Sequence, residues 1–418
     1  MTRRIWILFL LLCTIALLFA CTGEFALEDS SGAESSLQGD LQASFSSASS
    51  APSQSDVTSP VESSVGTSAA ESSTAESSTA EPSAVESSTE TSPAESTSSD
   101  EPSDEPSKEP SAPTESSEES SKEPEPLPVS KPHEVNGFLV YNYRAMEQFG
   151  GSATGGQLTA ELLNKFKERV GDGVNVYAMP IPNASAFYAP EGYERSITNT
   201  KNCIYGLRDA LVNVKFVDVY SALLPHTEEE IYARTDHHWF ALGAYYAAEE
   251  FCKVAGTGFA SLSQFERNSF DGFLGSAYSA YGVSELGKYP ETFVWFEPLQ
   301  SCTVNYYNHK FQSPSSGSLF SSSKGYTKFI RGDGNAVQIK TDISNGRRLL
   351  VVKDSFGNAL APFMIAGFEE VYFVDIREFA CNILTFIEEH QITDVSFSVS
   401  TFTVAGSKRD NITRLMNI

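Results

Sequence analysis

The chain has 418 residues, a formal net charge of −25 and a hydrophobic content of 40%. That length allows one or two globular domains, and no basic patch in the sequence indicates nucleic-acid binding. Residues 22–133 hold roughly 23 acidic and 3 basic side chains, which is about −20 of the total. The rest of the chain is therefore only mildly acidic.

The first twenty residues are typical of a signal peptide. Arg3 and Arg4 precede an apolar run of about 14 residues, shorter than the roughly 20 that a membrane-spanning helix needs. Ala20 and Cys21 follow, and a cysteine after a small residue resembles the lipobox of bacterial lipoproteins. The resemblance implies cleavage after residue 20 and a diacylglycerol group attached to Cys21 by a thioether. The two acyl chains of this lipid would hold the protein stably on a membrane. A short N-terminal membrane anchor is the alternative.

Residues 21–133 are predicted to be a disordered stalk. They consist mainly of Ser, Glu, Ala, Thr and Pro, with a repeated Glu-Ser-Ser-Thr-Ala unit between Glu71 and Glu81. Such a composition buries too little apolar surface to offset chain entropy. A flexible chain of this length spans roughly 60 Å. We therefore expect a domain on the extracellular face of the cytoplasmic membrane, with a stalk that reaches through the bacterial cell wall.

Residues 134–418 are predicted to form one α/β domain, because strand-like and helix-like segments alternate along them. Strands are expected at 138–143, 174–179, 214–220, 349–353, 371–374 and 395–398. Helices are expected at 157–170 with Gly171 as the stop, at 240–254, at 357–365 and around 379–390. This alternation favours a parallel sheet with helices on both faces.

Residues 268–338 interrupt the alternation, and we expect an irregular insertion over one end of the sheet. Its aromatic side chains either stack on sugar rings or pack in the core: Tyr278, Tyr281, Tyr289, Trp295 and Phe296. Four cysteines of the domain allow two disulfides or remain thiols, with Cys252 and Cys381 expected on apolar helix faces: Cys203, Cys252, Cys302 and Cys381.

Two segments carry groups for nucleophilic catalysis. Asp236, His237 and His238 precede the helix at 240–254, and Ser355 follows the strand at 349–353. A serine at the carboxyl end of a parallel strand is well placed for chemistry, and a helix N-terminus favours negative charge there. A histidine can remove its proton, and a carboxylate can orient that histidine.

Other interpretations of these segments remain open at this point. Asp236 or Thr235 would be a natural cap for the following helix, and Ser355 would be an ordinary cap for the next one. The Asp-His-His run would also suit a metal ion, although nothing nearby in the sequence supplies a further ligand. We therefore expect no metal, and no motif indicates a cofactor.

The sequence resembles the bacterial DHHW protein family over roughly residues 138–417. The most specific matches are Asp236-His237-His238-Trp239, preceded by Thr235, and Lys353-Asp354-Ser355-Phe356 with Ala361-Pro362-Phe363. Weaker matches are Val176-Tyr177-Ala178-Met179-Pro180, the glycine-containing segment at 270–276 and Val374-Asp375-Ile376-Arg377. That family is similar to the alginate O-acetyltransferases, which have an SGNH-hydrolase-like fold and transfer acetyl groups to exopolysaccharide.

The resemblance implies a role for each matching residue. Ser355 would be the nucleophile, His238 the base and Asp236 the carboxylate that orients it. His237, Arg234 and Trp239 would support the site. The family tends to carry an asparagine after the last strand, as a hydrogen-bond donor to the oxyanion or the substrate. This chain has no asparagine there. Ser400 or Thr401 would replace it, the hydrogen bond would come from another residue, or activity would be weakened.

The resemblance implies an O-acetyltransferase that acts on an extracellular or cell-wall polysaccharide. Acetyl-CoA is absent outside the cell, so we expect a membrane-bound acyltransferase partner as the donor. An esterase that removes acetyl groups from a glycan is one alternative. A surface protein that binds glycan without catalysis is the other, consistent with the missing asparagine.

Overall fold

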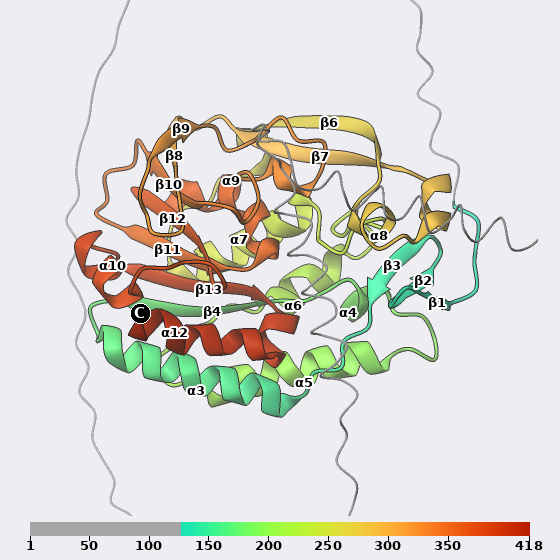
Figure 1. Cartoon of the computed structure of the whole chain (residues 1–418), viewed down its shortest axis with the longest axis horizontal. Helices are drawn as coiled ribbons and strands as arrows, with labels where there is room; N and C mark the ends of the chain where they lie inside the picture. Colours follow the sequence, from blue (N-terminus) through green and yellow to red (C-terminus); the bar gives the residue numbers. More distant parts are fainter. Residues whose placement is uncertain (1–126) are drawn as a thin grey trace, which may run out of the picture. The chain divides into compact units, whose positions relative to one another are not determined.

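The computed structural model describes residues 127–418, and Figure 1 shows how their helices and strands are arranged. The predicted signal peptide, Cys21 and nearly all of the predicted stalk lie outside the described residues, so they remain predictions. Within residues 127–418, no helix has the length and apolar character to cross a membrane.

Within the described residues, the central sheet has eight strands. Its neighbouring parallel strands are, in sheet order, β5 (Lys215–Phe216), β4 (Asn175–Ile181), β13 (Asp394–Ser400), β11 (Arg348–Lys353) and β12 (Glu370–Asp375). Antiparallel strands extend the sheet beyond β12, in the order β10 (Ala336–Thr341), β8 (Cys302–Tyr307) and β9 (Ser315–Gly317). The predicted α/β class with a mostly parallel sheet is confirmed.

Side chains alternate between the two faces of the sheet, as the two-residue period of a strand requires. On β11, Leu349 and Val351 join one core, and Leu350 and Val352 join the other. The first face is covered by α6 (Val219–Leu223), α7 (Ala241–Ala255) and α9 (Ala361–Met364). The second is covered by α3 (Ala153–Val170), α5 (Arg195–Ala210), α10 (Ile383–Glu389) and α12 (Asn411–Asn417); α3, α5 and α12 lie below the sheet in Figure 1.

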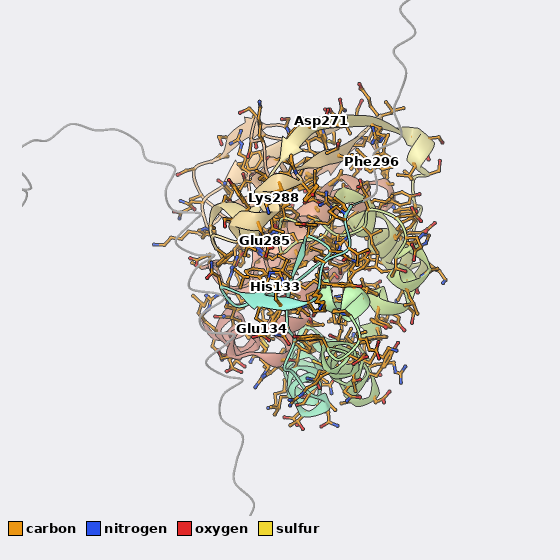
Figure 2. The ribbon with its side chains drawn as sticks, turned by 90° about the vertical axis from the view of Figure 1, so that its right-hand side faces the viewer. His133, Glu134, Asp271, Glu285, Lys288 and Phe296 are labelled. Atoms are coloured by element: carbon orange, nitrogen blue, oxygen red, sulfur yellow. The ribbon has the colours of Figure 1, made fainter. Side chains whose placement is uncertain are left out.

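A small antiparallel sheet precedes α3. It consists of β1 (His133–Val135), β2 (Phe138–Tyr141) and β3 (Arg144–Glu147), and it packs on α8 (Ser276–Ser279) and the segment that follows α8. His133 and Glu285, both labelled in Figure 2, join the two parts through an ion pair of 2.6 Å. A separate two-stranded sheet is formed by β6 (Phe265–Phe273) and β7 (Glu291–Pro298).

Three expected elements differ from the structure. The strand expected at 214–220 is wrong over most of its length: only Lys215 and Phe216 pair with β4, and Asp218 then caps α6 by accepting the N–H of Ser221. The strand expected at 138–143 belongs to the small sheet, not to the central one. The insertion expected at 268–338 is irregular only in part, because it contributes β7, β8, β9 and β10.

The four cysteines of the domain are free thiols, so the structure has no disulfide among the described residues. Cys203 on α5 and Cys252 on α7 are buried, and burial raises the pKa of the Cys252 thiol to about 11. Cys381 lies just before α10, not on a helix face as expected. Of the five aromatic residues singled out in the insertion, Phe296 is buried in the core and the other four are half-buried against it or its neighbours.

Candidate active site

A short loop carries the Asp-His-His-Trp segment into the site. An isolated bridge between Tyr232 and Trp239 closes the loop, and the N–H of Phe240 donates to the carbonyl of Ile231 at 3.0 Å. Helix α7 starts only after this point, with Phe240 as its N-cap. Asp236 therefore does not cap the helix, and its carboxylate is available for another role.

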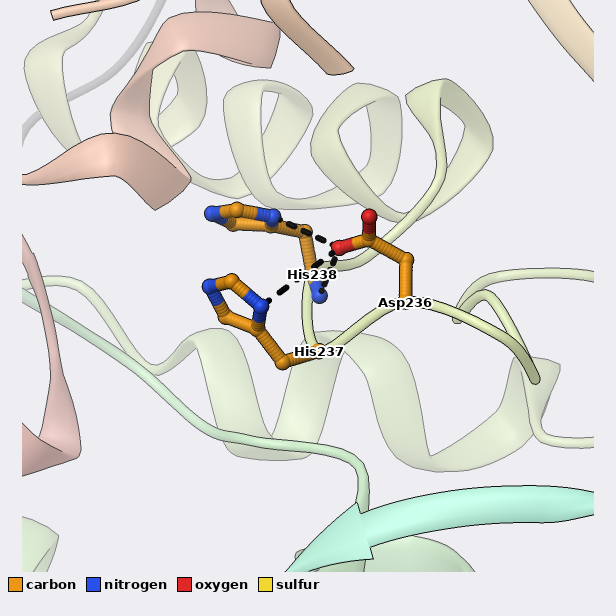
Figure 3. A group of neighbouring side chains, drawn as sticks. All are labelled: Asp236, His237 and His238. Carbon is orange, nitrogen blue, oxygen red and sulfur yellow. Dashed lines mark hydrogen bonds and ion pairs between the residues drawn. The ribbon is translucent and has the colours of Figure 1, made fainter. Parts of the chain in front are cut away.

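Asp236, His238 and Ser355 form a continuous chain of hydrogen bonds. The Oδ1 atom of Asp236 lies 2.8 Å from Nδ1 of His238, and Nε2 of His238 lies 2.8 Å from Oγ of Ser355. Because a carboxylate only accepts, the proton belongs on Nδ1, and Nε2 accepts from the serine hydroxyl. Figure 3 shows the carboxylate of Asp236 facing the Nδ1 side of the imidazole of His238. The arrangement has the geometry of a nucleophile, its base and the group that orients the base.

The carboxylate of Asp236 is buried and held from several sides. Its Oδ1 also accepts the backbone N–H of His238 at 3.0 Å, and its Oδ2 accepts the backbone N–H of Ser276 at 2.8 Å. Burial opposes the charged form, but the nearby imidazoles of His238 and His237 and these hydrogen bonds outweigh it. They hold the pKa of Asp236 well below the ordinary value. The carboxylate therefore stays ionised and keeps its orienting hydrogen bond.

Ser355 stands where strand β11 ends, at the carboxyl edge of the parallel sheet. Asp354, not Ser355, caps the short 3₁₀ helix that follows, because its Oδ1 accepts the N–H of Phe356 at 3.2 Å. The second carboxylate oxygen of Asp354 accepts the backbone N–H of Ser400 and the hydroxyl of Thr403, at 2.8 and 2.7 Å. The half-buried Ser355 is thus left to bond with His238.

A buried charge cluster supports the same strand end. The ammonium of Lys353, fully buried, lies 2.8 Å from Oδ1 of Asp333 and 3.4 Å from Oδ2 of Asp375. Arg377 bonds both carboxylates, and Asn358 donates to Asp333 at 2.8 Å. Burial opposes ionisation of Asp333, but Lys353 and Arg377 outweigh it and hold its pKa far below the ordinary value. The cluster fixes the chain on both sides of Ser355.

Glu291, at the start of β7, holds the other side of the histidine loop and was not predicted from the sequence. Its carboxylate accepts the backbone N–H of Arg234, and the backbone N–H and hydroxyl of Thr235, at 2.7, 2.7 and 2.6 Å. Burial raises the pKa of Glu291, and Arg234, whose Nε lies 3.6 Å away, opposes that shift. No local pattern marks Glu291, because its partners lie more than fifty positions earlier in the chain.

The supporting residues expected from the sequence occupy different places. His237 lies beside His238, with ring centroids 3.8 Å apart, and its Nδ1 is 2.6 Å from Oγ of Ser276. Trp239 is buried, and its indole N–H donates to the carbonyl of Phe356 at 2.9 Å. Both residues therefore belong to the site.

The side chains of Arg234 and Ser400 have hydrogen-bond partners outside the Asp236–His238–Ser355 chain. Arg234 donates from its guanidinium to the carbonyl of Tyr289 at 3.3 Å, so it braces the insertion. The hydroxyl of Ser400 caps α11 (Thr401–Ala405) by accepting the N–H of Thr403. This cap gives the Ser400 hydroxyl a structural partner, and the donor role expected for Ser400 remains a prediction.

Asp236, His237 and His238 are also the one group of described residues whose ligand atoms are close enough to hold a metal ion, all within 4.8 Å of one another. A metal ion at this position would compete for the atoms through which Asp236 and His238 bind each other and Ser355. We therefore assign these atoms to the hydrogen-bond chain.

Comparison with known proteins shows the family of the chain. The DHHW protein family matches residues 135–374, which is more than half of the chain. The crystal structure of a DHHW family protein from Eubacterium siraeum shares 39% sequence identity and a TM-score of 0.65, covering 69% of this chain and 98% of that one. The chain belongs to the DHHW family, as its sequence predicted.

More distant structures share less with the chain. Bacillus cereus PatB1, solved with a sulfonyl adduct, has 16% identity and a TM-score of 0.54 over 67% of this chain and 97% of that one. The O-acetyltransferase domain of Pseudomonas putida AlgJ has 13% identity over 69% of this chain and 98% of that one, with a TM-score of 0.38, too low to define a shared fold. No curated protein matches the chain.

Proposed function

We propose that this protein is an O-acetyltransferase that modifies an extracellular or cell-wall polysaccharide through Ser355, His238 and Asp236. The observation that carries the proposal is the unbroken chain from Asp236 to His238 to Ser355, with both links at 2.8 Å. Membership of the DHHW family supports it, because the sequence resemblance of that family to alginate O-acetyltransferases implies acetyl transfer.

The first half of the reaction forms an acetylated serine. Nε2 of His238 removes the hydroxyl proton as Oγ of Ser355 attacks the carbonyl carbon of an acetyl ester. Collapse of the tetrahedral intermediate breaks the ester bond, and the departing alkoxide takes the proton back from His238. The charged carboxylate of Asp236 stabilises the imidazolium between these two proton transfers.

The second half returns Ser355 to its starting state. A sugar hydroxyl gives its proton to His238 and attacks the acetyl carbon, and Oγ of Ser355 leaves and recovers that proton. Water as the acceptor would make the same three residues an esterase. The two activities therefore differ in the acceptor that reaches the acetyl group, and the chemistry on the protein is the same.

The location and the donor complete the proposal. A lipid on Cys21 would hold the protein at the extracellular face of the cytoplasmic membrane, with residues 21–133 as the tether. The acetyl donor outside the cell must arrive through the membrane. A membrane-bound acyltransferase that presents an acetyl group meets this requirement.

Turnover of an activated acetyl ester by the full chain tests the proposal. We expect the wild-type chain to release acetate, and Ser355→Ala and His238→Ala to lose nearly all of this activity. Ser316→Ala, at an exposed serine of β9, and His226→Ala, outside the site, are matched controls that should remain active. Equal turnover by the wild type and by Ser355→Ala would contradict the mechanism.

Added oligosaccharide acceptors then separate transfer from hydrolysis. Acetylated sugar among the products supports the transferase, whereas acetate alone, with every acceptor tried, favours the esterase. Glycan binding without any turnover by a folded wild-type chain would favour a non-catalytic binding protein.

A further inference from the structure

A segment of the insertion reaches the centre of the site. Residues 325–334, called the strap here, lie in the connection from β9 to β10 and place Tyr326 against His238. The two rings are parallel, with an interplanar angle of 2° and centroids 3.8 Å apart. The ring of Tyr326 therefore lies flat on the imidazole that links Asp236 to Ser355.

The phenol of Tyr326 joins the two loops that bear the reacting groups. Its hydroxyl accepts the indole N–H of Trp239 at 3.0 Å and donates to the carbonyl of Phe356 at 2.9 Å. Trp239 directly follows His238, and Phe356 directly follows Ser355. Burial raises the pKa of Tyr326 well above its ordinary value, so the phenol remains a donor. The hydroxyl of Tyr326 thus adds a second link between the histidine loop and the serine loop, beside the direct hydrogen bond from Trp239 to the carbonyl of Phe356.

The strap is fixed at both ends, so the position of Tyr326 is enforced. On one side, the ammonium of Lys328 lies over the ring of Trp295 and donates to the carbonyl of Ser321. On the other side, Asp333 binds the buried Lys353. Between them, Ile330 takes a φ of 41°, a left-handed conformation that a β-branched residue adopts only where its surroundings impose it.

The stacking of Tyr326 on His238 has two physical consequences for the imidazole. A ring stacked flat on the imidazole hinders its rotation, so Nε2 keeps pointing at Ser355 while Nδ1 keeps its bond to Asp236. The face of an aromatic ring also attracts a cation, and the imidazole becomes a cation in each half of the proposed reaction. The contact therefore favours both the correct orientation and the charged intermediate state.

We propose that Tyr326 is a positioning residue for His238: it holds the imidazole in line between Asp236 and Ser355 and stabilises its cationic form during acyl transfer. The effect of Tyr326 on the rate of acyl transfer rests on the proposed function. The structural part, that Tyr326 fixes the imidazole, does not depend on any activity.

Two substitutions separate the contributions of the ring and the hydroxyl. Tyr326→Phe keeps the stacked ring and loses the two hydrogen bonds of the hydroxyl, whereas Tyr326→Leu loses both the ring and these bonds. Loss of alignment at a reacting group can cost about a hundredfold in rate, so we expect Tyr326→Leu to lower kcat by about tenfold to a hundredfold with little change in KM. Tyr326→Phe should recover most of that loss.

Tyr246→Leu is the matched control, because Tyr246 stacks on His226 in the same way, with centroids 3.5 Å apart, outside the site. It should leave kcat unchanged. A change confined to KM in Tyr326→Leu would assign Tyr326 to substrate binding, and unchanged kinetics would give it no role. Either result overturns the inference.

A second measurement does not require activity. The chain has six histidines, so NMR of the full chain with labelled histidine rings can resolve His238, assigned by loss of its signal in His238→Ala. The stacked ring should shift the carbon-bound protons of His238 upfield in the wild type and in Tyr326→Phe. This shift should become clearly smaller in Tyr326→Leu, where only the neighbouring rings of His237 and Phe356 remain. A wild-type chain without this shift overturns the inference. A shifted but inactive wild type instead contradicts the proposed function and leaves the positioning role intact.

Discussion

The carboxylate of Glu291 receives both the backbone N–H and the hydroxyl of Thr235, at 2.7 and 2.6 Å. Thr235 directly precedes Asp236, and its hydroxyl in turn accepts the N–H of Gly275 at 3.0 Å. Glu291 and Gly275 both come from the insertion. The insertion therefore forms part of the framework that holds the orienting carboxylate in place.

Replacing Glu291 by glutamine tests this framework. The amide would present an NH₂ group where one carboxylate oxygen now accepts hydrogen bonds. That NH₂ group would be buried against N–H or O–H groups with no acceptor, which costs about 1–3 kcal/mol. We expect Glu291→Gln to lower the free energy of unfolding by that amount and to reduce ester turnover, measured by denaturant titration and initial rates. Glu266→Gln, at an exposed position of β6, is the control. Equal stability and activity of the two variants would contradict the role of Glu291.

Gly275 is predicted to tolerate no side chain. A Cβ there would lie 2.5 Å from Oδ2 and 2.8 Å from Cα of Asp236, so the backbone or the carboxylate must move. Overpacking of this kind costs about 1–3 kcal/mol, and here it also displaces the group that orients His238. Gly275→Ala should lose stability and turnover together. Gly173→Ala is the control: nothing lies within 4 Å of the added Cβ, so stability and turnover should not change. Full activity of Gly275→Ala would contradict the close contact between Gly275 and Asp236.

Asp236→Asn should damage catalysis and leave the nucleophile in place. The amide nitrogen can turn toward Nδ1 of His238 and favour the wrong tautomer, which in a comparable triad lowers kcat by about 10⁴-fold. Initial rates with an activated acetyl ester measure this loss. A variant with wild-type kcat would show that Asp236 does not orient the base.

The lowered pKa of Asp236 also predicts how stability depends on pH. A carboxyl whose pKa is lower in the folded chain stabilises the fold above its unfolded value, near the ordinary 3.8, and this contribution disappears as the pH falls toward the folded value. The stability difference between the wild type and Asp236→Asn should therefore be largest near neutral pH and shrink in acid. Unfolding titrations at several pH values measure it, and a difference that grows in acid would have the wrong sign.

Lys353 is expected to be essential for the fold of the serine loop. Its removal leaves the carboxylates of Asp333 and Asp375 without their buried ammonium partner, and breaking a buried ion pair costs about 3–5 kcal/mol. Lys353→Met should show that loss in thermal or chemical unfolding. Lys340→Met removes an ion pair whose lysine is about half exposed and should cost at most about 1 kcal/mol. Similar costs for the two variants would argue against the buried cluster.

The three residues of the hydrogen-bond chain could be singled out from the sequence because simple local rules apply to them. Asp236 and His238 are two positions apart, and Ser355 follows an apolar strand whose end had to lie at the functional edge of a parallel sheet. The parallel strands β4, β11, β12 and β13 and the helices α3, α7, α9 and α10 followed from the same alternation of apolar segments. Each of these features is determined by residues that are close to one another in the sequence.

The remaining features depend on distant contacts. Glu291, Tyr326 and Asp333 come from segments without a regular apolar pattern, and their partners are fixed only when the insertion folds back on the sheet. Helix α5 was missed for a different reason. Ser196 and Thr200 occupy its buried face beside Leu207, so its apolar stripe is too weak to mark a helix.

The most direct measurement is the intact mass of the full chain after brief exposure to an activated acetyl ester, followed by acid quenching and peptide mapping. The proposed mechanism predicts a mass increase of one acetyl group located on Ser355, absent in Ser355→Ala and formed far more slowly in His238→Ala. Acetylation at another residue, or the same acetylation in Ser355→Ala, would contradict Ser355 as the nucleophile.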